Sequence, residues 1–78
     1  MRILFFTQLK DVTQCAELSV SWGRVDVEGL WQKLLALQPG LERYRASVRL
    51  ARNSEYVGPD AVFTDADEVA LIPPVSGG

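Results

Sequence analysis

Few residues of this sequence could perform chemistry with their side chains. The sequence contains no histidine, which excludes Ser-His-Asp and Cys-His nucleophile systems and most zinc sites. Cys15 is the only cysteine and has no CxxC partner, so we interpret it as a small buried or half-buried residue. The glycines at positions 23, 29, 40 and 58 are isolated and form neither a dinucleotide-binding motif nor a P-loop. We therefore expect a substrate or carrier with no bound metal or cofactor, whose catalytic machinery lies on other proteins.

The C-terminal stretch PPVSGG, residues 73–78, is the part of the sequence that suggests a reaction. Consecutive prolines fix φ and lack amide donors, so Pro73 and Pro74 are expected to end sheet pairing and to direct the chain outward. Val75 and Ser76 then lead away from the domain. We predict that residues 73–78 form an extended tail.

The two glycines that end the sequence suit a reaction at a main-chain carboxylate. Gly77 and Gly78 have no Cβ, so they can enter a narrow channel and allow another protein's backbone or ATP to approach closely. A carboxylate is a poor electrophile until its oxygen becomes a good leaving group, which an adenylating enzyme achieves by forming an acyl-adenylate. The predicted reactive group is therefore the carboxylate of Gly78.

Length and composition indicate one soluble globular domain. The chain has 78 residues, of which 47% are hydrophobic and 23% are charged, so a single compact core is expected. The net charge is -2 at pH 7, and no basic stripe could neutralise phosphates, which argues against a nucleic-acid partner. The apolar run from Ile3 to Phe6 is too short for a signal peptide or a membrane span. Because no internal disulfide is possible, we expect a cytoplasmic protein.

The segment after Arg52 is acidic. It contains no Lys or Arg, and its acidic residues are Glu55, Asp60, Asp65, Asp67 and Glu68. Two interpretations fit this charge: a surface that suits a basic partner, or a solvated acidic loop. The sequence does not distinguish between them.

Apolar runs predict two central strands. Residues 2–7 (RILFFT) and 68–72 (EVALI) are nearly continuous in apolar residues, as expected for strands with neighbours on both sides. Residues 17–22 alternate between polar and apolar types, which predicts a half-exposed strand. We expect this strand to form a hairpin with the first strand through a polar loop at residues 8–16.

Two further strands are expected in the second half of the sequence. They span residues 47–52 and 55–57 and are joined by a turn at Asn53-Ser54. An irregular stretch begins at Pro59-Asp60, and a turn at residues 65–67 leads into the last strand.

One helix is expected between the two halves of the sheet. Asp26 can cap it, and Pro39-Gly40 should end it. Its apolar residues follow helical spacing, and we interpret them, including Trp31, as core: they are Val27, Leu30, Trp31, Leu34 and Leu37. The elements together predict an α+β fold of the ubiquitin-like β-grasp type, in which one main helix packs across one face of a mixed sheet. This domain is expected to span residues 1–72.

Strand parity predicts an apolar area on the sheet face away from the helix. In the last strand Glu68 marks the outer face and shares it with Ile72, so Val69 and Leu71 should point into the core. By the same logic Phe6 lies on the outer face of the first strand. We favour a docking surface at this area, since monomers rarely leave large apolar patches uncovered. Scattered exposed apolar residues are the other interpretation.

Two sequence motifs and the predicted fold together resemble a known family. FFTQ at residues 5–8, DADEVALIPPVSGG at residues 65–78 and the β-grasp fold resemble the small, sulfur-carrier subunits of molybdopterin synthase. The similarity spans the whole chain, and the PPV-x-GG ending is specific within that superfamily. The thiamine-pathway sulfur carrier and ubiquitin-like modifiers share the diglycine but typically lack the double proline. A sulfur carrier for thiamine or another pathway, and a ubiquitin-like protein modifier, are the alternative functions.

The resemblance implies a cycle in molybdenum cofactor biosynthesis. A ubiquitin-activating-like adenylyltransferase would use ATP and magnesium to adenylate Gly78, and a persulfide sulfur donor would convert it to a thiocarboxylate. The tail would then enter the large synthase subunit, in a heterotetramer, and deliver sulfur to cyclic pyranopterin monophosphate. The catalytic side chains would belong to the large subunit. The family's apolar contact surface maps onto Phe6, Tyr56 and Ile72.

One position departs from the family pattern. The turn before the last strand is usually Asp-Gly-Asp, whereas this sequence has Asp65-Ala66-Asp67. An alanine would cost about 1 kcal/mol if that position requires a positive φ. The geometry of this turn is therefore left open by the sequence.

Overall fold

The computed structural model describes residues 1–74. In chain order, the elements within these residues are β1 (Arg2–Phe5), α1 (Gln8–Thr13), β2 (Glu17–Ser19), β3 (Val25–Asp26), α2 (Val27–Leu37), the 3-10 helix η1 (Pro39–Tyr44), β4 (Arg49–Arg52), β5 (Glu55–Tyr56), β6 (Val62–Phe63) and β7 (Glu68–Ile72).

Strands β1 and β7 lie side by side near the middle of a mixed sheet with the order β2-β1-β7-β4-β5. They pair in parallel, from Arg2 opposite Glu68 to Phe5 opposite Leu71. The other pairs in this sheet are antiparallel. The two apolar runs of the sequence are therefore the central strands, as predicted, because each is flanked by a neighbour on both edges.

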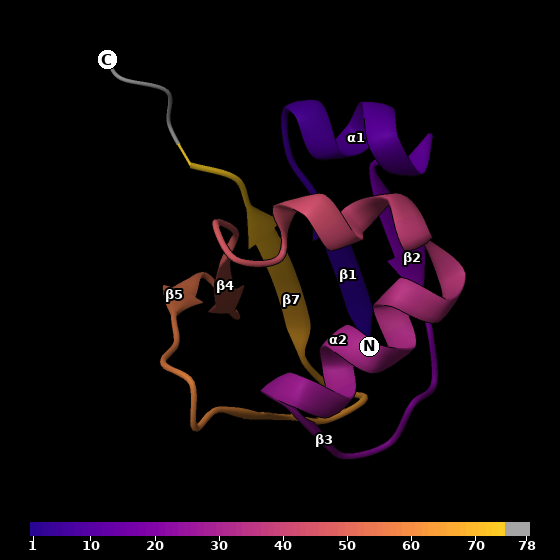
Figure 1. Cartoon of the computed structure of the whole chain (residues 1–78). Helices are drawn as coiled ribbons and strands as arrows, with labels where there is room; N and C mark the ends of the chain where they lie inside the picture. The colour runs from indigo at the N-terminus through magenta and orange to yellow at the C-terminus, as the bar shows by residue number, and fades with distance from the viewer. Residues whose placement is uncertain (75–78) are drawn as a thin grey trace.

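Helix α2 lies across one face of this sheet (Figure 1). The Asp26 carboxylate accepts a hydrogen bond from the Gly29 backbone N–H at 2.7 Å, which confirms the predicted N-cap. The apolar face of α2 packs on the sheet, where Leu30, Trp31 and Leu34 are buried and Val27 is half-buried. Burial of a large apolar side chain stabilises a fold by roughly 1.5 to 3 kcal/mol, so this layer holds the domain together. The interpretation of Leu37 as core was wrong, because this last residue of α2 is 53% exposed.

The core between helix and sheet contains the side chains that strand parity predicted. Ile3, Phe5, Val69 and Leu71 are at most 2% exposed. Cys15 is half-buried against this core, as expected. The arrangement confirms the α+β, ubiquitin-like β-grasp prediction. Within residues 1–74, no helix has the length and apolar character needed to cross a membrane.

The predicted polar loop at residues 8–16 was wrong, because residues Gln8–Thr13 form α1. Leu9 and Thr13 lie on its buried side, and the Thr13 hydroxyl donates to the Leu9 carbonyl at 3.0 Å. Only six residues long and largely polar, this helix carries too few apolar positions to show a helical period in the sequence. It covers the end of the sheet toward which β1 runs (Figure 1).

Strand β1 ends at Phe5, two residues earlier than predicted. Thr7 has φ 48° and ψ -125°, a conformation that cannot continue a strand and that is strained for a β-branched residue. Strand β2 is likewise shorter than the predicted 17–22 and ends at Ser19.

Two short features of the structure were not predicted. Strands β3 and β6 form a second, two-stranded antiparallel sheet, and β6 lies in the stretch after Pro59-Asp60 that is expected to be irregular. The 3-10 helix η1 begins at Pro39, just after α2 has ended at Leu37. Strands of two residues give no alternation to detect, and proline is favoured at the first position of a helical turn.

Both expected turns are present, at residues 53–54 and 65–66. Asn53 and Ser54 both have positive φ, as a two-residue hairpin of the primed type requires. Ala66 is not among the residues of the described chain with positive φ. Alanine at this position therefore causes no positive-φ strain in the turn.

Candidate docking surface and tail exit

The outer face of the sheet, on the side away from α2, carries an apolar groove of about 240 Å³. We name it the tail-end groove. It is lined by Leu4, Phe6, Ala51, Ser54, Tyr56, Glu68, Ala70 and Ile72. The groove therefore brings together Phe6, Tyr56 and Ile72, the residues expected to bind a partner. Their role in binding stays a prediction.

Strand register explains why these side chains meet. Ala51 on β4 lies opposite Ala70 on β7, so two small side chains form the floor of the groove. Ala51 also lies opposite Tyr56 on β5. Phe6 is 42% exposed and Tyr56 is 57% exposed, so large apolar side chains form the walls. Ile72 is half-buried between them. Small residues below large exposed ones make a recess that an apolar side chain of another protein could fill.

The tail leaves the domain beside this groove. Strand β7 ends at Ile72, after which Pro73 is buried and Pro74 is exposed. The end of sheet pairing at the prolines agrees with the prediction. Val75, Ser76, Gly77 and Gly78 lie outside the described residues, and the division into a domain of residues 1–72 and a tail stays a prediction.

An arginine that was not predicted lies at the base of the tail. Arg49 is opposite Ile72 in the β4–β7 pair. Its guanidinium carbon lies 4.2 Å from the centroid of the Tyr56 ring, a cation–π geometry. Parity in the strand at 47–52 could have placed Arg49 on the outer face, opposite Val48 and Leu50, but its stacking depends on the β4–β5 hairpin.

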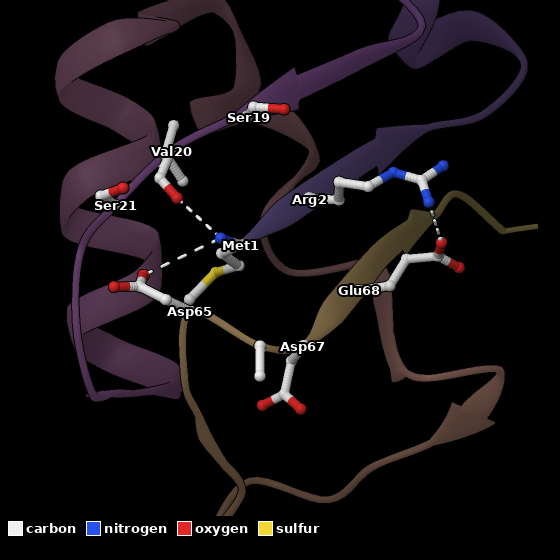
Figure 2. A pocket seen from close by; sticks show the side chains of 9 residues that line it. Met1, Arg2, Ser19, Val20, Ser21, Asp65, Asp67 and Glu68 are labelled. Carbon is white, nitrogen blue, oxygen red and sulfur yellow. Dashed lines mark hydrogen bonds and ion pairs between the residues drawn. The ribbon is translucent and has the colours of Figure 1, made fainter.

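A polar hollow of about 560 Å³ lies at the other end of the sheet, where β1 and β7 begin. The Asp65 carboxylate accepts from the backbone N–H groups of Trp22 and Gly23 at 2.9 and 3.0 Å. The Met1 ammonium donates to the Val20 carbonyl at 2.7 Å and lies 3.8 Å from the Asp65 carboxylate; Figure 2 draws both interactions as dashed lines. These contacts join three segments that are distant in the sequence.

The neighbouring acidic residues also have partners within the chain. Arg2 forms ion pairs with Glu68 at 2.9 Å (Figure 2) and with Glu17 at 3.3 Å, which links the outer faces of β1, β2 and β7. Asp67 accepts from the Thr64 backbone N–H at 2.8 Å and from the Asn53 amide at 3.0 Å.

Hydrogen bonding keeps Asp67 ionised. The Thr64 backbone N–H, followed by the Asn53 side chain, lowers the pKa of Asp67 below its ordinary value of 3.8. Asp65, Asp67 and Glu68 thus serve the fold, which weakens the interpretation of the acidic segment as a surface for a basic partner.

No group of three His, Cys, Asp or Glu side chains in residues 1–74 could hold a metal ion. Among the described side chains, the Thr64 hydroxyl donates to the Asp67 carboxylate at 3.4 Å, in the turn where the same carboxylate accepts from the Thr64 backbone N–H. The arrangement can present the C-terminal segment to another protein. It offers that protein an apolar recess beside the point where the PPVSGG segment leaves the sheet.

Sequence comparison finds known relatives of this chain. The model of the ThiS family matches residues 3–78. The molybdopterin synthase sulfur carrier subunit of Arabidopsis thaliana is 32% identical over 79 residues, which cover 100% of this chain and 82% of that protein. The protein of the same name from Chlamydomonas reinhardtii is 33% identical over 81 residues, with 100% and 98% covered.

Solved structures show the same fold. SAMP1 from Haloferax volcanii superposes with a TM-score of 0.84 at 28% identity, covering 100% of this chain and 98% of that one. A chain from the complex of subunits 1 and 2 of molybdopterin-converting factor from Helicobacter pylori superposes with a TM-score of 0.69 at 22% identity, with 99% and 96% covered. Because a single family model accounts for nearly the whole sequence, from the first central strand to the final glycine, this chain belongs to the ThiS family of ubiquitin-like sulfur carriers.

Proposed function

We propose that this protein is the sulfur-carrier subunit of a molybdopterin synthase and that its reactive group is the Gly78 carboxylate. One observation carries the proposal: the fold places an apolar groove, formed by Phe6, Tyr56 and Ile72, beside the exit of the PPVSGG tail. A carrier needs both a surface for its partners and a terminus that can reach into them. The relatives named as molybdopterin synthase sulfur carrier subunits support the choice of pathway.

The proposed reaction occurs at the main-chain terminus. In an adenylyltransferase, an oxygen of the Gly78 carboxylate attacks the α-phosphorus of ATP with magnesium bound, which gives an acyl-adenylate and releases pyrophosphate. The terminal sulfur of a persulfide then attacks the acyl carbon, and AMP leaves. A thiol of the donor protein cleaves the resulting sulfur–sulfur bond, forms a disulfide there, and leaves a thiocarboxylate on Gly78. The protein itself needs no bound cofactor.

The proposed acceptor is cyclic pyranopterin monophosphate held by a large synthase subunit. The groove docks on that subunit and the tail carries the sulfur into its active site, where the partner supplies the catalytic side chains. The Helicobacter pylori protein of this fold was solved with its subunit 2, which supports a partner of this kind. We propose a heterotetramer with two carriers on a dimer of the large subunit, in the cytoplasm.

Intact-mass measurement tests the proposal. Incubation with the adenylyltransferase, ATP, magnesium and a persulfide donor should replace one oxygen of Gly78 by sulfur. The charged protein, mixed with the large subunit and cyclic pyranopterin monophosphate, should then return to its original mass as molybdopterin forms. An unchanged mass alongside a family carrier that is converted in the same mixture would refute a sulfur-carrier role. Sulfur loading without transfer to the pyranopterin would point instead to thiamine or another sulfur pathway.

A protein-modifier function is the second candidate, because the chain is similar to SAMP1, a small archaeal modifier protein. Conjugation would attach Gly78 to lysine amines of other proteins through isopeptide bonds. It predicts adducts of higher mass that persist on reducing, denaturing gels and disappear when Gly78 is deleted. A sulfur carrier alone gives no such adducts.

A further inference from the structure

We propose that Arg49, held over the Tyr56 ring, binds a carboxylate side chain of the protein that receives the tail. This inference rests on the proposed function, because it concerns the docking of the carrier on the large synthase subunit. It adds a charged, specificity-determining contact beside a groove that is apolar at this end.

Arg49 lies where a protein that takes up the tail would contact the domain. It lies opposite Ile72, the last residue of β7 before the tail prolines. It shares the outer face of β4 with Ala51, which lines the tail-end groove. A protein that covers the groove and takes up the tail would therefore also cover the Arg49 guanidinium.

Arg49 has no anionic partner among residues 1–74, as is also true of Lys10, Arg24, Lys33, Arg43 and Arg52. Arg2 pairs with two glutamates, and Arg45 pairs with Glu28 at 2.5 Å. Arg52 donates to the Val62 carbonyl at 2.6 Å. For Arg49 the described contact is the ring of Tyr56, at 4.2 Å.

This contact prepares the guanidinium for binding. Stacking on an aromatic ring restricts the side chain while the N–H groups at its edge stay free to donate. A restricted arginine loses less conformational entropy when it forms a bidentate pair with a carboxylate. Tyr56 therefore has two roles in this proposal: it forms a wall of the groove and it positions the cation.

The surrounding charges favour an acidic partner group. The one carboxylate that lines the groove, Glu68, lies at its far end and is already paired with Arg2. Arg49 does not line the groove, but through its contacts with Ile72 and Tyr56 it adds one positive charge beside the apolar tail end of the groove. A complementary surface would place a Glu or Asp at the edge of an apolar patch, because an unpaired arginine covered by apolar groups would be unfavourable.

The experiment measures equilibrium binding of the full-length chain to the large molybdopterin synthase subunit at increasing NaCl concentration. Arg49→Gln should weaken binding by about tenfold and flatten its salt dependence. Arg49→Lys should restore only part of the affinity, because an ammonium cannot form the two parallel hydrogen bonds. Tyr56→Phe should bind like the wild type, since it keeps the aromatic ring. The thermal midpoint should stay the same in all three variants.

Arg43→Gln is the matched control. Arg43 is also exposed and lies over an aromatic ring, that of Tyr44 at 6.0 Å, but it belongs to η1 rather than to the outer face. This variant should bind within about twofold of the wild type. A double-mutant cycle with acid-to-amide variants of the large subunit should then identify one carboxylate whose loss has no further effect once Arg49 is replaced.

Three results would overturn the inference. Arg49→Gln could bind like the wild type while Phe6→Ala binds poorly, which would leave the proposed function intact and remove this contact. Equal losses for Arg49→Gln and Arg43→Gln would show only a general effect of net charge. Failure of the wild-type chain to bind the large subunit would overturn both this inference and the proposed function.

Discussion

Phe5 and Leu71 are parallel partners in the two central strands, and both are buried in the core. Because successive side chains of a strand alternate, the next residues along each chain, Phe6 and Ile72, emerge together on the outer face. The burial of Phe5 and Leu71 thus fixes the positions of Phe6 and Ile72 on the docking surface. The separation of the two faces can be tested one residue at a time.

Replacement of Phe6 should weaken docking and spare the fold. Phe6→Ala removes an exposed wall of the groove, so we expect a loss of at least tenfold in affinity for the large subunit. Its cost in unfolding free energy should be below about 1 kcal/mol. Phe5→Ala is the control and should cost about 3 to 5 kcal/mol, because it leaves a cavity in the core. Chemical denaturation and calorimetric binding measure both effects, and a large stability loss in Phe6→Ala would contradict the assigned parity.

Deletion of Gly78 should abolish sulfur loading without unfolding the protein. The reactive carboxylate would move to Gly77, one residue short of its position in the adenylyltransferase. The core residues of the described chain lie between Met1 and Leu71, so we expect the thermal midpoint to stay within about 2 °C of the wild type. Intact mass after the loading reaction and a thermal melt give the two readouts. A protein that still loads sulfur after the deletion would exclude Gly78 as the sole acceptor.

Asp65→Ala should destabilise the fold by about 1 kcal/mol, because it leaves the Trp22 and Gly23 N–H groups without their acceptor. The partial exposure of Asp65 keeps this cost modest. Asp60→Ala, at an exposed position of the same acidic segment, should change stability by less than about 0.5 kcal/mol. Urea unfolding of the two variants compares them directly. Equal effects would show that Asp65 acts only through net charge.

Asp67 should make stability depend on pH in the acidic range. Its pKa is lowered in the folded protein, chiefly by the Thr64 N–H and then by Asn53, so the ionised form favours folding. This contribution is fully present above the ordinary value of 3.8 and is lost as the pH falls through the lower folded-state pKa. Asp67→Asn should therefore be less stable than the wild type at pH 6, and the difference should shrink below about pH 4. A constant difference down to pH 2 would contradict the assignment.

Thr7→Gly should stabilise the protein by about 1 kcal/mol, although it adds freedom to the unfolded chain. Thr7 has φ 48° and ψ -125°, which glycine adopts without steric cost and a β-branched residue does not. Thr64→Gly, at a residue that is not among those with positive φ, should instead destabilise. Thermal melts of both variants decide the point, and destabilisation by Thr7→Gly would show that the Thr7 side chain contributes more than its backbone strain costs.

Alternation and apolar content were enough to predict the sheet and its two faces. The runs around Ile3 and Val69 had to be central because a strand with such continuous apolar character requires cover on both sides. Asp26 and the spacing from Leu30 to Leu34 specified α2 through local capping and periodicity. These signals lie within a few residues of one another, which is why the sequence alone reveals them.

The missed features depend on contacts between distant segments or on very short elements. Helix α1 is stabilised by the packing of Leu9 into a core made by other strands, and the pairing of β3 with β6 joins Val25 to Phe63. The contact of Arg49 with Tyr56 requires the β4–β5 hairpin. The tail-end groove was predicted only as two outward-facing residues, and Tyr56 came from the family resemblance, because its strand is too short to show parity.

The step from buried Pro73 to exposed Pro74 has a consequence for recognition. Pro73 is the last buried residue of the described chain, so we expect the core to keep the same shape whether or not sulfur has been loaded at Gly78. An enzyme that must distinguish a loaded carrier from an empty one would then gain no information from the body of the protein. It would have to contact the last atoms of the chain. The loading enzyme and the synthase would then compete for the same body of the protein in its loaded and in its empty state.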